Sequence, residues 1–285
     1  MAMIKKLADK LSSFTQSVAS LLKVMLLSRY STVKPSARCG EEIVVLGNGP
    51  SLLDTIANHS SFLAARRSLA VNFAAITDEF FTLKPDYYVL ADPLFFKDEA
   101  TARIERLWEV LRQEVDWQMT LYVPATECGP RLQSLSTNPH LRVEKYNLTP
   151  IEGGKGFCRY AFSHGWGMPR PRNVLIPSIM LAIAGGYKKI YVAGADHSWM
   201  STISVDDDNR VVSIQPHYYK DDEGEQKRVN KEYMNYPLHQ IVYSFYVAFR
   251  SYHIIKDYAD GLGVEIYNIT PGSFIDAFPR LTPDD

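Results

Sequence analysis

The 285-residue sequence has little of what marks a specialised class of protein. Its only cysteines are Cys39, Cys128 and Cys158, whose number and wide spacing argue against a disulfide framework and a cysteine-based metal site. We interpret them as reduced thiols in a cytoplasmic protein. No run of apolar residues reaches the roughly 18 to 20 that span a bilayer, so the sequence predicts no membrane-spanning helix.

Net charge and repetition are also lacking. The formal net charge is -1, which gives no global reason to expect nucleic acid as a partner. The sequence contains no internal repeat and no low-complexity segment. With 46% hydrophobic and 22% charged residues, it is typical of a globular protein that buries the core of one large α/β domain.

The most informative motif follows a short apolar segment. Glu42 to Leu46 predicts a strand, and Gly47-Asn48-Gly49-Pro50-Ser51 predicts a tight turn into a helix. Both glycines can adopt a positive φ and let a ligand approach the backbone, and Ser51 can cap the helix. Free N–H groups and the helix dipole at such a turn suit an anion such as a nucleotide phosphate. An ordinary strand-to-helix turn is the alternative.

The N-terminal segment, Ile4 to Arg29, contains no Gly or Pro and repeats apolar residues at helical spacing. It predicts an amphipathic helix, which forms a separate segment over residues 1–30. Five basic residues oppose the single Asp9, a balance expected of a helix on an anionic lipid surface. Packing on the protein's own core, or on a second subunit in a homo-oligomer, is the alternative. A signal peptide fits less well, because polar residues interrupt the apolar region.

Strand-like and helix-like segments alternate beyond residue 41, which is typical of an open, mostly parallel sheet flanked by helices. We therefore predict one Rossmann-like α/β domain over residues 41–285. The predicted strands are Glu42 to Leu46, Ser68 to Val71, Tyr87 to Ala91, Met119 to Val123, Leu141 to Tyr146, Lys189 to Ala193 and Val264 to Tyr267. Helices are predicted after Ser51 and over Ala100 to Glu114, Ile176 to Ala184 and Pro237 to Leu262.

Polar residues stand at four of the predicted strand ends. Asn48, Asn72 and Asp92 follow the first three strands, and Asp196-His197-Ser198 follows a later one. Ligands of parallel α/β folds collect beyond the carboxyl ends of the strands. Four such ends predict one polar cleft, although each residue alone could be a turn former or a helix cap.

Four segments are informative when they are taken together: Val45 to Leu52, Val71-Asn72, Tyr88 to Pro93 and Ala184 to Asp196. In combination they resemble bacterial sialyltransferases of the lipooligosaccharide type. They are also similar to bacterial polysaccharide-locus proteins known as hydroxymethylpterin-diphosphokinase-like. The resemblance covers roughly residues 41–278, and only its two glycine-bearing segments are specific.

The resemblance implies a GT-A-like variant of the α/β fold, with a small lid at about residues 199–236, that binds a CMP-activated sugar. The positions implied to contact the nucleotide are Gly47, Asn48, Gly49, Ser51, Asn72, Gly194, Ala195 and Asp196, and Ser198 stands at the same strand end as Asp196. Asp92 stands where the sialyltransferases carry Asn, which argues against sialic acid as the donor sugar. Asn173 lies at the start of a helix that the resemblance includes. In the family this helix begins with small hydroxyl and glycine residues, so the sequence departs from the family pattern at this position.

Inverting glycosyl transfer, which the resemblance implies, needs a base that takes the proton of the acceptor hydroxyl. Histidine suits this role, because its unperturbed pKa of ~6.5 lies near working pH. The family uses a lid histidine, and His217 lies within the long polar segment Trp199 to Tyr236. His217 is therefore our first candidate, His239 the second and His197, beside Asp196, the third.

No metal site is predicted. Asp206-Asp207-Asp208 superficially resembles the Asp-x-Asp metal motif of other glycosyltransferases, but its neighbours favour a solvated hairpin turn. Basic and aromatic lid residues would instead stabilise the leaving phosphate.

The leading hypothesis is an inverting, metal-independent glycosyltransferase. It would move a sugar from a nucleotide-sugar donor to a glycan or glycolipid acceptor, on the cytoplasmic face of the membrane. One alternative is a pyrophosphokinase that requires Mg²⁺ and acts on a hydroxymethyl substrate. The other is a non-catalytic scaffold for polysaccharide assembly.

Overall fold

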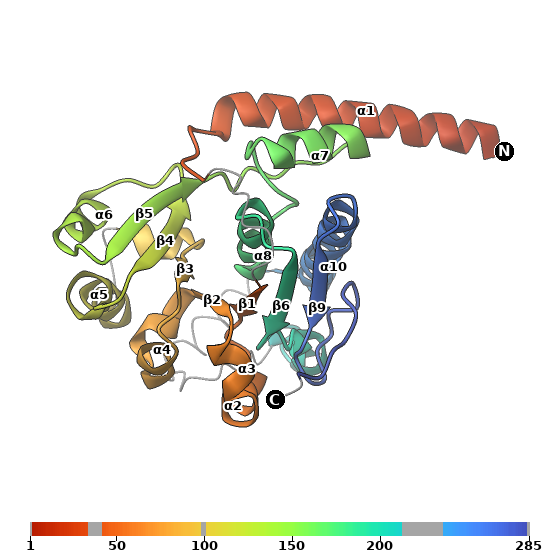
Figure 1. Cartoon of the computed structure of the whole chain (residues 1–285). Helices are drawn as coiled ribbons and strands as arrows, with labels where there is room; N and C mark the ends of the chain where they lie inside the picture. Colours follow the sequence, from red (N-terminus) through yellow and green to blue (C-terminus); the bar gives the residue numbers. More distant parts are fainter. Residues whose placement is uncertain (1, 34–41, 98–100, 213–235, 284–285) are drawn as a thin grey trace.

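The computed structural model describes residues 2–33, 42–97, 101–212 and 236–283. Its centre is a seven-stranded sheet in the order β5-β4-β3-β2-β1-β6-β9, in which all neighbours run parallel (Figure 1). The strands are β1 (Glu42–Leu46), β2 (Arg67–Val71), β3 (Tyr87–Val89), β4 (Met119–Pro124), β5 (Leu141–Tyr146), β6 (Lys189–Ala193) and β9 (Glu265–Asn268). Each lies within two residues of a predicted strand, so the α/β, Rossmann-like prediction is confirmed.

Helices cover both faces of the sheet (Figure 1). The α-helices are α1 (Ala2–Leu27), α2 (Ser51–Asn58), α3 (Ser60–Ala64), α4 (Asp78–Leu83), α5 (Ala102–Glu109), α6 (Pro130–Ser134), α7 (Lys155–Ser163), α8 (Leu175–Ala184) and α10 (Leu238–Asp260). Short 3₁₀ or π turns are η1 (Asn72–Ile76), η2 (Pro93–Phe96), η3 (Val110–Glu114), η4 (Leu135–Thr137) and η5 (Ser198–Thr202), and β7 (Ser204–Val205) pairs with β8 (Val211–Val212). The predicted helix over 100–114 is α5 continued by the π turn η3.

Strand β1 shows why the sheet is buried on both sides. Its last four residues are all buried, as expected of a parallel strand covered on both faces. Ile43 and Val45 join the core formed with α8 and α10, whereas Val44 and Leu46 join the core formed with α2 and α3. The other half of the sheet packs on α4 and α5 around the buried Tyr88 and Trp108.

The strand order reverses at β1. The chain runs outward from β1 to β5, returns to β6 on the other side of β1, and ends at β9. In open α/β sheets this reversal opens a crevice beyond the carboxyl ends of the two strands that flank it. The segments that follow β1 and β6 are therefore placed to form a site together.

The predicted amphipathic helix forms as α1, which runs along the outside of the molecule in Figure 1. It contacts the body through serines. The Ser17 hydroxyl accepts from the backbone N of Gly154, and Ser20 exchanges hydrogen bonds with the backbone of Glu152. Val24 packs against the core formed with α8 and α10, whereas most of the large apolar side chains of α1 are exposed. No helix among the described residues is both long and apolar enough to cross a membrane.

Candidate functional site

A cleft of about 530 Å³ opens beyond the carboxyl ends of β1, β2, β3 and β6. Nine of the site residues predicted from the sequence line it: Asn48, Gly49, Asn72, Asp92, Asn173, Gly194, Asp196, His197 and Ser198. The fold therefore brings the polar strand ends together, at the point where the strand order reverses.

The glycine turn after β1 is shaped by its neighbour β6 and not by a positive φ. Neither Gly47 nor Gly49 has a positive φ, contrary to our expectation. Their backbone N–H groups donate to the carbonyls of Ala193 and Gly194, both at 2.8 Å, so these two donors are not free for a phosphate. A Cβ at Gly47 would lie 2.4 Å from the Gly194 oxygen. Glycine is required here because two backbones touch.

Ser51 does not cap α2. It is the first helical residue, Pro50 holds the N-cap position, and the N-cap makes no side-chain hydrogen bond. The Ser51 hydroxyl instead donates to Oδ2 of Asp196 at 2.8 Å. That carboxylate also fills the space beside Gly49, where a Cβ would come within 1.8 Å of the same oxygen. The start of α2 therefore already holds an anion of the protein itself.

Asn48 and Asp92 each have a structural role in addition to lining the cleft. Nδ2 of Asn48 donates to the Val71 carbonyl at 3.3 Å, which ties the ends of β1 and β2 together. Oδ1 of Asp92 accepts from the backbone N of Leu94 and caps η2. Asn72 has a φ of 49°, and its Oδ1 is buried without a hydrogen-bond partner in the described structure.

His197 lies at the inner wall of the cleft, 7% exposed and with a φ of 51°. Its Nε2 lies 2.6 Å from the Tyr252 hydroxyl, which donates to Oδ1 of Asn173 at 3.0 Å. The same Oδ1 accepts from the backbone N of Leu175 at the start of α8. Burial lowers the pKa of His197 to about 3, so the imidazole is neutral near pH 7.

Three residues of this region were not predicted as site residues: Arg172, Trp199 and Tyr252. Arg172 lines the cleft, is exposed, and has no ion pair among the described residues. The Trp199 ring lies 4.1 Å from the His197 ring, centroid to centroid, and also lines the cleft. Tyr252 is fully buried in α10. The only signal in the sequence that could have pointed to any of the three was an arginine four residues before the predicted helix Ile176 to Ala184.

The remaining predicted residues lie elsewhere. Gly47, Ser51 and Ala195 support the cleft without lining it, and the Ala195 N–H donates to Thr270 Oγ1 at 3.0 Å. His239 is exposed at the start of α10 and does not line the cleft. His217 lies outside the described residues, as does most of the predicted lid.

The three aspartates at 206–208 form the turn of a hairpin, as predicted. β7 and β8 pair on either side of them, and the backbone N of Asp206 donates to the Arg210 carbonyl at 3.0 Å. Oδ1 of Asp206 accepts from the backbone N of Asp208 and of Arg210. Within the described ranges, no three His, Cys, Asp or Glu side chains come together as a group that could hold a metal ion.

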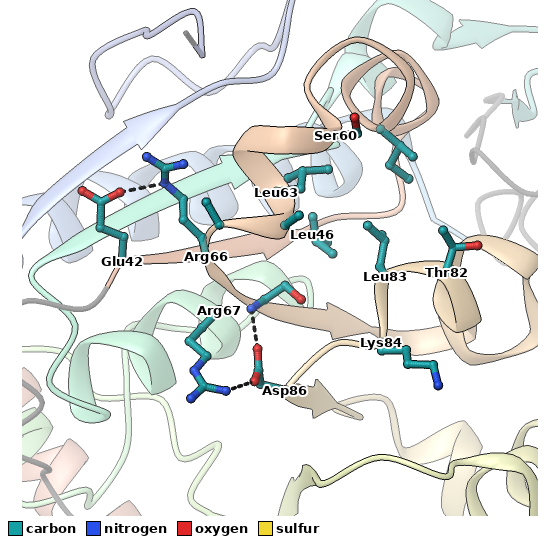
Figure 2. A pocket seen from close by; sticks show the side chains of 14 residues that line it. Glu42, Leu46, Ser60, Leu63, Arg66, Arg67, Thr82, Leu83, Lys84 and Asp86 are labelled. Carbon is teal, nitrogen blue, oxygen red and sulfur yellow. Dashed lines mark hydrogen bonds and ion pairs between the residues drawn. The ribbon is translucent and has the colours of Figure 1, made fainter. Parts of the chain in front are cut away.

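A second cavity, of about 810 Å³, lies beside the amino ends of β1 and β2 (Figure 2). Its cations are already paired with carboxylates. Arg66 pairs with Glu42 at 2.7 Å, Arg67 pairs with Asp86, and Lys84 pairs with Asp116 at 3.0 Å. Since each of these positive charges has a counter-ion, this cavity attracts an anionic ligand less strongly than the cleft does.

Comparisons with known proteins give a fold and no family. No family model and no curated protein matches the sequence. Among solved structures, the MAf glycosyltransferase from Magnetospirillum magneticum AMB-1 is similar, with a TM-score of 0.53 and 14% sequence identity. The match covers 94% of this chain but only 38% of that one, so this chain spans less than half of its length. At this identity the likeness shows a shared fold.

Proposed function

We propose that the protein is a glycosyltransferase that moves a sugar from a nucleotide donor to a bacterial surface glycan. The observation that carries the proposal is the cleft where the strand order reverses. Polar residues from four strand ends line it, together with Arg172, which has no ion-pair partner among the described residues. The likeness in fold to a glycosyltransferase supports the proposal. A CMP-sugar is the favoured donor, because of the resemblance to sialyltransferases.

The charges of the cleft suggest how a donor would lie in it. The Asp196 carboxylate sits at the glycine turn and would repel a phosphate, but it can accept hydrogen bonds from ribose or sugar hydroxyls. Arg172 is the cation of the cleft and suits the phosphate. The buried Oδ1 of Asn72 is an acceptor that a donor group of the ligand, or a water molecule, would satisfy.

In the proposed reaction, the acceptor oxygen attacks the anomeric carbon as the bond from that carbon to the phosphate oxygen breaks. The nucleotide leaves with the electron pair, and a base takes the acceptor proton. His197 suits this role poorly, because a histidine with a pKa of about 3 is a weak base at neutral pH. His239 does not line the cleft. We therefore retain His217 as the proposed base. Independence from a divalent metal remains part of the proposal.

The test is binding of CMP, CDP, UDP, GDP and ATP by calorimetry, each with EDTA and with Mg²⁺. We expect one of the pyrimidine nucleotides to bind equally well in both conditions. Asn48→Ala should weaken that binding about tenfold, which corresponds to about 1.4 kcal/mol. Asn58→Ala, at the exposed C-terminal end of α2, is the matched control and should bind as the wild type does.

Each other outcome separates the alternatives. Absence of nucleotide binding would reject the proposal. Binding of ATP that requires Mg²⁺ would favour the pyrophosphokinase, for which Asp92 and Asp196 are two carboxylates in the same cleft. Tight nucleotide binding without sugar transfer would favour the scaffold.

A further inference from the structure

Helix α1 presents an apolar stripe to the outside of the molecule. Leu7, Leu11, Phe14, Leu22 and Met25 recur at helical spacing, and each of them is between 55% and 69% exposed. Isolated exposed apolar residues are ordinary, but a continuous stripe along a helix marks an interaction surface. The stripe belongs to no described core cluster.

The polar contacts that α1 and the residue after it make with the body fix the direction in which this stripe points. Ser20 is 1% exposed and makes two hydrogen bonds of 2.8 Å with the backbone of Glu152. Ser28 hydrogen-bonds to Thr149 and to the Trp166 carbonyl, at 2.8 and 2.6 Å. Gly153 lies so close to Ser17 that a Cβ there would be 2.7 Å from the Ser17 backbone N. Turning the stripe inward would break this polar contact surface.

The charge on α1 indicates the chemistry of the partner. The helix carries four lysines and a single acidic residue, Asp9. Lys6 and Lys10 are exposed and make no ion pair within the described ranges. Helical spacing places Lys6 and Lys10 on the same flank of the apolar stripe, where their heads can reach lipid phosphates while their stems cover apolar surface.

A second copy of the chain fits the stripe less well than a lipid surface does. Leu7, Leu11, Phe14, Val18, Leu21 and Met25 have the alternating spacing of four and three that a two-helix seam uses. Leu26 lies outside that seam and is 71% exposed. A partner helix would leave it in water, whereas a bilayer surface would cover the whole width of the stripe.

We propose that α1 binds the surface of an anionic bilayer, with its axis in the plane of the membrane and its apolar stripe in the headgroup region. The helix would hold the protein there without crossing the bilayer. The proposal does not depend on the function of the cleft.

The test is sedimentation of the full chain with vesicles of phosphatidylcholine and phosphatidylglycerol, and with vesicles of phosphatidylcholine alone. We expect binding to the mixed vesicles that high salt weakens. The double variant Leu11→Ser and Phe14→Ser should bind at least tenfold more weakly. The double variant Lys6→Gln and Lys10→Gln should lose its preference for the anionic vesicles. Gln16→Ser, on the exposed polar side of α1, should bind as the wild type does.

Two results would overturn the proposal. One is a wild-type chain that does not sediment with the mixed vesicles. The other is a dimer in light scattering that becomes a monomer in the Leu11→Ser and Phe14→Ser variant, which would assign the stripe to a second copy. None of the substituted residues lines the cleft, so nucleotide affinity should be unchanged throughout. A failure here is therefore distinct from a failure of the proposed glycosyltransferase.

Discussion

At the scale of single residues, the cleft is organised around a histidine that the fold has made a poor base. His197 joins α10 to the start of α8 through Tyr252 and Asn173. It also holds a left-handed conformation, as does Asn72 at the end of β2. Such conformations cost about 1–3 kcal/mol and persist only where the surroundings impose them. Two residues of one cleft hold this conformation, which indicates that the fold fixes the positions of their side chains.

Burial of His197 predicts a specific pH dependence of stability. Its pKa is about 3 in the folded protein against ~6.5 when unfolded, so only the unfolded chain takes up the proton between these values. The stability that depends on the neutral form of His197 is therefore fully present above about pH 6.5. It is lost as the pH falls toward 3, by up to about 1.4 kcal/mol per pH unit.

Denaturant unfolding at several pH values measures the slope of the free energy of unfolding against pH. His197→Asn tolerates the left-handed conformation and does not titrate, so its slope should be flatter than that of the wild type. His239→Gln, at an exposed position, should keep the wild-type slope. Equal slopes for the wild type and His197→Asn would show that the histidine is not buried as described.

Much of the residue set of the cleft could be predicted from the sequence, because Asn and Asp after apolar segments mark the ends of parallel strands. The partners of these residues could not. The hydrogen bond between Ser51 and Asp196 joins residues far apart in the chain, and it overrides the local tendency of serine to cap a helix. The packing of Gly47 on Gly194 is likewise a tertiary contact that no local pattern encodes.

At the scale of elements, prediction succeeded where the pattern is long or fully apolar. The strands of the sheet are short apolar runs, and α1 has a clear helical period. The short helices α4, α6 and α7 were not predicted, because few turns carry little periodicity. The direction in which the apolar face of α1 points also depends on tertiary contacts. Ser17, Ser20 and Val24 meet the body, whereas the leucines of α1 are exposed.

The docking of α1 should therefore depend on a buried serine. Ser20→Ala removes the hydroxyl that serves both the N–H and the carbonyl of Glu152, and buried backbone groups without partners cost about 1–3 kcal/mol. We expect the amide hydrogens of α1 and of Glu152 to exchange faster than in the wild type, by the factor to which this loss of free energy corresponds. Ser12→Ala is the control, because Ser12 is exposed on the same helix and the change has the same effect on helix propensity. Equal amide exchange rates in both variants would contradict the described contact between α1 and Glu152.

At the scale of the whole molecule, the two ends of the parallel sheet differ in how their charges are balanced. At the amino ends, arginines and lysines are neutralised by carboxylates, as Figure 2 shows for Arg66 and Arg67. At the carboxyl ends, Arg172 is without an ion pair among the described residues and faces the cleft. The segment directly after α1 is anchored beside the cleft, because Ser28 and Arg29 hydrogen-bond to the residues on either side of Leu148, which lines the cleft.

This asymmetry predicts opposite effects for two arginines. Arg172→Gln should lower nucleotide affinity by tenfold or more, because a charge-assisted hydrogen bond to phosphate is worth about 1.5–3 kcal/mol, and it should leave the free energy of unfolding unchanged. Arg67→Gln breaks an exposed pair with Asp86. It should cost at most about 1 kcal/mol of stability and leave nucleotide affinity unchanged. Calorimetry and denaturant unfolding of both variants measure the four quantities. The reverse result would move the nucleotide site to the cavity at the amino ends of the strands.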